Sequence, residues 1–221
     1  MMDRDTRLSG LSQEICMAGL HSWFGPSTEE IWRQLCAEIG ASYVEGGFWK
    51  GDKVQATHGS WKITLDIYTV STGKSSTQYT RIRAPYINPD GFRFTVYRKS
   101  FVSDIGKWFG MQDIEIGIEP FDQEFILKTN QEIKLRELLA DVKLRELIAG
   151  QPQIHFCVKD NDDSTLFQKD FPQGVDELCF QVAGAIKDVE RLKLLYDLFS
   201  ETLDQLCRIG SAYDRPSSVS L

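Results

Sequence analysis

The sequence predicts an α+β domain in which helices, one of them long and C-terminal, pack on an antiparallel β-sheet. Three observations lead to this prediction. Residues 61–99 contain three runs in which apolar and polar side chains alternate, which is the period of a half-buried strand. Helical periodicity precedes this region, and it returns in a stretch of about 20 residues near the end of the chain. Strand and helix patterns are thus clustered, which favours α+β over alternating βαβ units.

Length and composition fit one folded unit. The chain has 221 residues, of which 42% are hydrophobic, so it can bury a sizeable core. Residues 1–12 and 211–221 are polar and lack periodicity, and we expect them to be flexible tails around a single domain at residues 13–210.

The first helix is expected directly after Pro26. Ser27 and Glu30 have the spacing of a capping box, an apolar stripe follows, and Gly40 provides the end signal. The stripe predicts that this helix packs on the sheet.

The runs SWKITLDIYTV, QYTRIRAPY and GFRFTVYRK are predicted to be strands of an antiparallel meander, with a turn at residues 88–91 between the last two. Alternation assigns their side chains to two faces. One face is expected to carry Trp61, Ile63, Leu65, Ile82, Phe92, Phe94 and Val96. The opposite face is expected to carry Lys62, Tyr68, Tyr79, Arg81, Arg83, Arg93, Tyr97 and Lys99.

A short helix is expected near residues 102–109, followed by strands at EIGIE and FDQEFIL. Carboxylates gather here, at Asp113, Glu115, Glu119, Asp122 and Glu124. Alternation places Asp113 and Glu115 on one face, an arrangement that suits acid–base chemistry or a hard metal ion. Such clusters are more often solvated edges, where charge discourages strand addition.

Residues 134–150 contain the near-repeat KLRELLAD and KLRELIAG. The copies are nine residues apart, which rotates the second apolar stripe by about 180° from the first on a straight helix. Two short helices with a break near Asp141 resolve this conflict; one helix buried on two sides is the alternative.

The last third of the chain predicts strands at QIHFCVK and ELCFQVAGAI, with a possible hairpin strand at residues 165–168 between them. Asp188 is expected to cap a long helix that ends at Arg208. His155 and Cys157 share one face of their strand. If the two strands pair, Cys179 could lie across from them on the neighbouring strand. No fourth ligand for a closed zinc site is evident, so buried thiols beside a histidine are expected and no metal is assigned.

The five cysteines are odd in number, widely spaced and without a C-x-x-C pair, which predicts a reduced, cytoplasmic setting. No stretch reaches the length of about 20 apolar residues that a membrane span needs. The segment STGKSST resembles a phosphate loop, but Tyr68 stands where that motif needs its first glycine and a strand follows the lysine. We expect a hairpin loop, no nucleotide at Lys74 and no cofactor.

Charge is unevenly distributed. The net charge is -7, but residues 46–100 contain nine Lys or Arg against three Asp, a local +6 that leaves -13 for the remainder. The face with Tyr79, Arg81, Arg83, Arg93 and Tyr97 combines charge with stacking surface, as a site for an acidic protein or another anionic partner does. The arginines could instead pair with carboxylates of the same chain.

The sequence therefore favours a non-enzymatic binding or interaction module that uses this face of the sheet. The alternative is an enzyme with a carboxylate site around residues 101–125. No catalytic residue is assigned.

The blocks TRIRAPY, FRFTVYRKS, IGKWFGMQDIEIG, FDQEFILKTN and DVERLKLLYDLF resemble, in the same order, a group of uncharacterised bacterial proteins. The similarity extends over residues 60–208 and implies a single folding unit. It implies no activity, so no catalytic residue is transferred.

Overall fold

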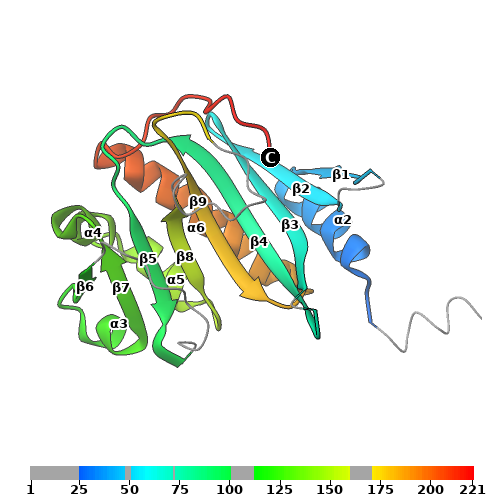
Figure 1. Cartoon of the computed structure of the whole chain (residues 1–221), viewed down its shortest axis with the longest axis horizontal. Helices are drawn as coiled ribbons and strands as arrows, with labels where there is room; N and C mark the ends of the chain where they lie inside the picture. The colour runs from blue at the N-terminus through cyan, green and yellow to red at the C-terminus, as the bar shows by residue number, and fades with distance from the viewer. Residues whose placement is uncertain (1–24, 48–50, 72, 101–111, 160–170) are drawn as a thin grey trace, which may run out of the picture.

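The computed structural model describes residues 25–47, 51–71, 73–100, 112–159 and 171–221. These residues form a nine-stranded antiparallel sheet with helices packed on it, which confirms the predicted α+β class (Figure 1). The strand order across the sheet is β1-β2-β3-β4-β9-β8-β5-β7-β6. The strands are β1 (Ser42–Val44), β2 (Lys53–His58), β3 (Trp61–Ser71), β4 (Ser76–Ile87), β5 (Phe94–Arg98), β6 (Gln112–Ile114), β7 (Phe125–Thr129), β8 (His155–Lys159) and β9 (Val175–Ala183). The helices are α2 (Thr28–Ile39), α3 (Glu119–Glu124), α4 (Glu132–Leu138), α5 (Val142–Ala149) and α6 (Val189–Arg208).

The predicted meander is confirmed for its first two strands, β3 and β4, which pair antiparallel, but it is wrong for the third; β1 and β2, which extend the sheet beyond β3, were not predicted. β5 does not pair with β4, because β9 and β8 lie between them. The turn after β4 explains the difference. The Asn88 amide donates to the Phe92 carbonyl and to the Asp176 carboxylate, and the Asn88 backbone N–H donates to the Gly174 carbonyl. The turn is therefore bonded to the start of β9, and it directs β5 away from β4.

The apolar sheet face and the long helix are both confirmed. All seven residues predicted for that face are buried. Asp188 caps α6 by accepting a hydrogen bond from the Arg191 N–H. α6 lies behind the central strands in Figure 1, where the Phe199 ring meets the Phe156 ring edge-on at 5.5 Å. The sheet and α6 thus share one core.

The near-repeat is broken where its periodicity predicts. α4 ends at Leu138, α5 begins at Val142, and Asp141 caps α5 by accepting a hydrogen bond from the Leu144 N–H at 2.8 Å. Each helix then buries its own stripe, Leu135 and Leu138 on α4 and Leu144 and Ile148 on α5.

Other local predictions have mixed outcomes. The capping box of Ser27 and Glu30 and the end of α2 at Gly40 are confirmed. The segment FDQEFIL is not one strand, because the Asp122 carboxylate accepts hydrogen bonds from the backbone N–H groups of residues 116–118 and folds the segment into α3 before β7 begins. EIGIE (residues 115–119) is not a strand, because β6 ends at Ile114, directly before it, and α3 begins at Glu119. The helix expected near 102–109 and the hairpin strand at 165–168 lie outside the described residues.

The segment that begins at Ser211 starts as packed structure rather than as a tail. Ser211 and Ala212 are buried, Tyr213 forms a β-bridge with Ile87, and the Asp214 carboxylate accepts a hydrogen bond from the Ser60 N–H at 2.8 Å. These contacts tie the segment to the strands of the meander. The tail expected at residues 1–12 lies outside the described residues. Within the described part of the chain, no helix combines the length and apolar character that crossing a bilayer requires.

Candidate functional site on the outer sheet face

The sheet face opposite α6, called the outer face here, carries charged and aromatic side chains at its centre. Alternation along β3, β4, β8 and β9 places ten side chains together there, seven of them charged or aromatic: Thr64, Asp66, Tyr68, Tyr79, Arg81, Arg83, Cys157, Lys159, Glu177 and Cys179. Most are buried or half-buried although the face is polar. This face is the candidate site.

Asp66 holds two of the predicted arginines. Its carboxylate accepts two hydrogen bonds from the Arg81 guanidinium, at 2.8 and 2.9 Å, and one from Arg83 at 2.6 Å. The side chains are only 21% (Arg81), 11% (Arg83) and 17% (Asp66) exposed. Burial alone would raise the pKa of Asp66, but the hydrogen bonds and charges of the two arginines hold it below its ordinary value. The two arginines therefore lie on the predicted face without forming a free positive surface.

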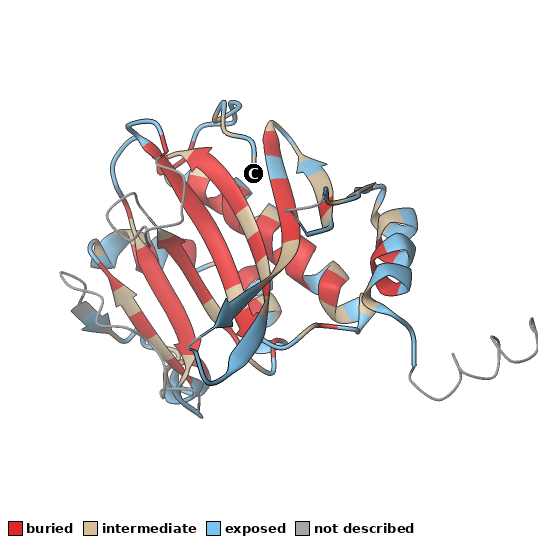
Figure 2. Cartoon of the chain, turned by 45° about the vertical axis from the view of Figure 1, so that its right-hand side comes forward, coloured by how far each residue is buried: buried red, intermediate tan, exposed pale blue. Residues whose placement is uncertain are grey.

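Two stacked tyrosines border this ion-paired group. The Tyr68 and Tyr79 rings are 5.4 Å apart and 20° from parallel, and the Arg81 guanidinium lies 4.5 Å from the centre of the Tyr68 ring. We call these three side chains the tyrosine platform. The hairpin beyond it is exposed at residues 69–71 and 73–78 (Figure 2). The platform thus connects the buried polar centre of the face with an exposed β-ribbon.

Glu177 lies deeper in the same face. It is directly opposite Lys159 on β8, and its carboxylate is 3.6 Å from the Arg83 guanidinium. The side chain is 1% exposed, and neither carboxylate oxygen has a hydrogen-bond partner among the described residues. Burial, reinforced by the nearby Cys179, raises the pKa of Glu177 to about 7.

This raised pKa predicts a pH-dependent stability. Between the unfolded pKa of 4.5 and the folded pKa of about 7, the folded state keeps the Glu177 proton and the unfolded state does not. The free energy of unfolding should therefore fall as pH rises through this window, and Glu177→Gln should reduce that fall. Urea unfolding at pH values from about 5 to about 8 measures it, with exposed Glu115→Gln as the control. Equal slopes in wild type and Glu177→Gln would contradict the prediction.

The two central cysteines converge as the strand pairing predicts. Cys157 and Cys179 are direct cross-strand partners, and each is 1% exposed. Their thiols hydrogen-bond to each other, which lowers the pKa of Cys179 against the effect of burial and raises that of Cys157. His155 lies at the start of β8, where burial lowers its pKa to about 4, so its imidazole is neutral at pH 7. Among the described residues, no three metal-ligating side chains gather into a site.

The structure separates the five predicted site residues. Tyr79, Arg81 and Arg83 lie together on β4. Tyr97 lies on β5, three inter-strand spacings or roughly 14 Å away, and it is only 5% exposed. Arg93 precedes β5, and its carbonyl accepts hydrogen bonds from the Thr129 hydroxyl and the Asn130 N–H. One continuous site over all five residues would need β5 beside β4, and β9 and β8 occupy that place.

Lys74 lies in the hairpin loop between β3 and β4, as expected. Ser71 pairs with Ser76 across the loop, and β4 follows it directly. The backbone N–H groups of a helix N-terminus, which hold phosphate in a phosphate loop, therefore do not follow Lys74.

Three of the five carboxylates in the region of the alternative enzyme site, Asp113, Glu115 and Asp122, line a cavity of about 340 Å³ beside β6 and β7. Asp122, one of these residues, uses both carboxylate oxygens for backbone N–H groups. Asp113 is 71% exposed and pairs with Lys128 at 3.2 Å. These contacts give Asp122 and Asp113 structural roles. They do not favour this cavity over the outer face as the functional site.

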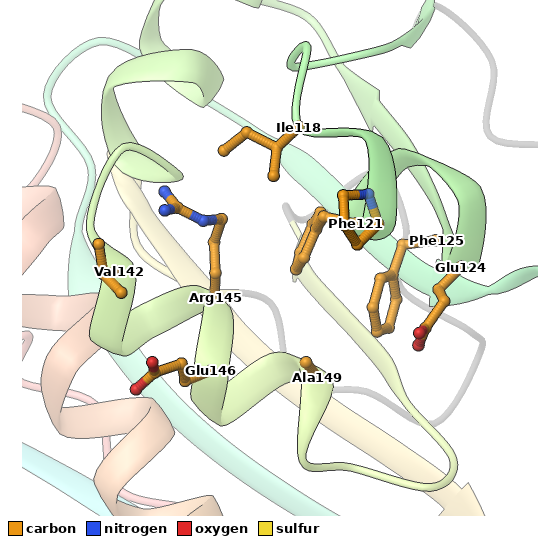
Figure 3. A pocket seen from close by; sticks show the side chains of 9 residues that line it. Ile118, Phe121, Glu124, Phe125, Val142, Arg145, Glu146 and Ala149 are labelled. Carbon is orange, nitrogen blue, oxygen red and sulfur yellow. The ribbon is translucent and has the colours of Figure 1, made fainter.

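A second, apolar groove of about 200 Å³ lies between α3 and α5 (Figure 3). Phe121 and Phe125 form one wall, with ring centres 4.6 Å apart, and Val142 and Ala149 of α5 lie opposite. This volume is below the roughly 300 Å³ at which small-molecule pockets begin.

Sequence reasoning missed the partners that neutralise the arginines. These partners are Asp66, which binds both Arg81 and Arg83, and Glu177, which lies beside Arg83; neither belongs to the site that the sequence predicts. The pairing of Asp66 with Arg81 does have a signal in the sequence. In a hairpin centred between Gly73 and Lys74, the numbers of directly paired residues add to 147, so Asp66 lies opposite Arg81. No comparable local signal existed for Glu177, because β9 is separated from β4 by almost 90 residues.

No family model matches the chain, and neither does any curated protein. Among solved structures, the chain is similar to one described as the crystal structure of the mycobacterial trehalose monomycolate transport factor A, TtfA. The TM-score is 0.45 and the sequence identity 10%, over 87% of this chain and 98% of that one. A likeness of this degree carries no argument about function, and the resemblance to the bacterial group stays a prediction.

Proposed function

We propose that this chain is a non-enzymatic binding module that recognises an acidic segment of a partner protein through the tyrosine platform. The observation that carries the proposal is the platform itself. Tyr68 and Tyr79 are stacked and half-buried, and Arg81 is held over Tyr68 by its two hydrogen bonds to Asp66. A surface fixed in this way loses little side-chain entropy on binding, and tyrosine and arginine are enriched where proteins meet.

Local charge supports an acidic partner. On the outer face of β3, β4, β8 and β9, the four cations Lys62, Arg81, Arg83 and Lys159 stand against the two carboxylates Asp66 and Glu177. The excess is two positive charges on a chain whose net charge is -7. So small an excess suits a short acidic peptide better than a nucleic acid, which is typically bound by a strongly basic domain.

The test is a titration of the whole protein with a fluorescent polyglutamate peptide at low salt. Tyr79→Ala should weaken binding at least about tenfold, the effect of losing an interfacial contact of about 1.4 kcal/mol. Tyr213→Ala is the matched control, because Tyr213 is an exposed tyrosine outside the platform. Binding should also weaken as salt screens the exposed charges.

Two outcomes would refute the proposal. Equal affinities for the Tyr79→Ala and Tyr213→Ala variants would remove the platform from the interface. A single-stranded RNA oligonucleotide that binds through Tyr79 more tightly than the acidic peptide would contradict the partner class.

A further inference from the structure

The two central thiols are placed for a reaction that a binding module does not require. In the antiparallel register, one cross-strand row runs Thr64, Arg83, Cys179, Cys157 and Thr95 over five strands. Directly opposed residues in such a sheet have Cα atoms about 4.5 to 5.5 Å apart, inside the range of about 4.4 to 6.8 Å found for disulfides. The two cysteines can therefore be joined with little movement of the backbone.

The row also distinguishes the two thiols. Cys179 lies between Arg83 and Cys157, whereas Cys157 lies between Cys179 and the neutral Thr95. Lys159 is two residues from Cys157 on the same face, diagonal to Cys179. A cation directly beside Cys179 favours the thiolate at that position, and the thiolate is the nucleophilic form.

Charge balance in the group gives the same assignment. Arg81, Arg83 and Lys159 carry three positive charges, whereas Asp66 and Glu177 supply at most two negative ones. A thiolate at Cys179 would supply the missing negative charge. The lowered pKa of Cys179, caused first by the Cys157 hydrogen bond and then by Lys159 and the two arginines, is consistent with this balance.

We propose that Cys157 and Cys179 are a redox pair that hydrogen peroxide converts to a disulfide between β8 and β9, with Cys179 as the attacking thiol. The Cys179 thiolate attacks one peroxide oxygen, so an S–O bond forms, the O–O bond breaks and hydroxide leaves as water after it takes a proton. The Cys157 thiol then attacks the sulfenic sulfur, the S–S bond forms, and the sulfenic oxygen leaves as a second water. The two thiols are oxidised by two electrons and one peroxide is reduced. This proposal does not depend on the proposed function.

Burial governs how the reaction must be measured. Both cysteines are 1% exposed, so peroxide reaches them only during brief openings, and the extent of oxidation is a better measure than the rate. The reduced whole protein is treated with excess hydrogen peroxide, alkylated, digested and analysed by mass spectrometry. We expect a linked peptide that joins Cys157 to Cys179 and disappears on reduction with dithiothreitol.

Two variants separate a redox pair from a pair of merely buried thiols. In Cys157→Ser the sulfenic acid has no thiol partner, so dimedone should label Cys179. In Cys179→Ser, dimedone should leave Cys157 unlabelled. Cys36 and Cys207, both half-buried, are internal controls for general oxidation.

The linked peptide together with labelling at Cys179 supports the whole proposal. Two reduced central thiols in wild type, under conditions that oxidise Cys36 or Cys207, would overturn the redox pair. Dimedone labelling of Cys157 instead of Cys179 would overturn the assignment of the attacking thiol. Circular dichroism confirms beforehand that both variants are folded; if serine prevents folding, alanine replaces it.

Discussion

Arg81→Glu/Arg83→Glu is expected to destabilise the fold by about 3 to 5 kcal/mol, the range for buried ion pairs that lose one partner. Both arginines bind Asp66, and Arg83 also faces Glu177, which is 1% exposed. The double variant would place four carboxylates on one mostly buried face, with Lys53 opposite Asp66 and Lys159 opposite Glu177 as the neighbouring cations that remain. Urea unfolding followed by circular dichroism measures the loss.

Lys62→Glu/Lys74→Glu is the matched control for this experiment. It makes the same change in net charge at two exposed lysines in the same hairpin region, where substitutions usually shift stability by no more than about 0.5 kcal/mol. A double arginine variant as stable as this control would contradict the ion-paired arrangement. It would instead support the exposed basic face that the sequence suggested.

Phe156→Ala should also lower the free energy of unfolding by about 3 to 5 kcal/mol, the usual effect of truncating a core phenylalanine. Phe156 is fully buried on β8, and its ring meets Phe94 of β5 at 5.7 Å and Phe199 of α6 at 5.5 Å, both edge-on. Removing it leaves a cavity where the sheet and α6 join. Chemical denaturation measures the effect.

Phe156→Leu is the control, because it preserves most of the apolar volume. It should cost clearly less than the alanine variant. Equal losses for the two variants would show that cavity volume is not the cause, and a loss below about 1 kcal/mol for Phe156→Ala would contradict the shared core.

Local patterns in the sequence predicted most elements of this fold. The capping box of α2, the break at Asp141 and the apolar face of the meander all depend on residues close in sequence, where periodicity and caps act directly. The sequence left open whether Cys157 and Cys179 meet, because that depends on the pairing of β8 with β9, and the structure shows this pairing.

The position of β5 and the neutralisation of the arginines could not be predicted in the same way. Both depend on β9 entering the sheet beside β4, a contact between residues about 100 positions apart. Alternation fixes which face a side chain occupies, but it does not fix which strand is its neighbour. Of the five residues predicted for one site, Tyr79, Arg81 and Arg83 therefore lie together, and Arg93 and Tyr97 do not join them.

The strand order also determines which surfaces the chain exposes while it is still being synthesised on the ribosome. When synthesis has reached Gly174, β4 can already pair with β3. The other edge of β4, at Thr80–Ile87, still lacks its partner, because β9 has not yet been made. α6, which covers the apolar side of the sheet, comes later still. Up to that point the nascent protein exposes an open strand edge and an uncovered apolar surface, the two features that promote association between incomplete chains. The sheet is therefore completed late in synthesis. We expect holdase chaperones to find the largest exposed apolar surface on the nascent chain just before β9 and α6 emerge.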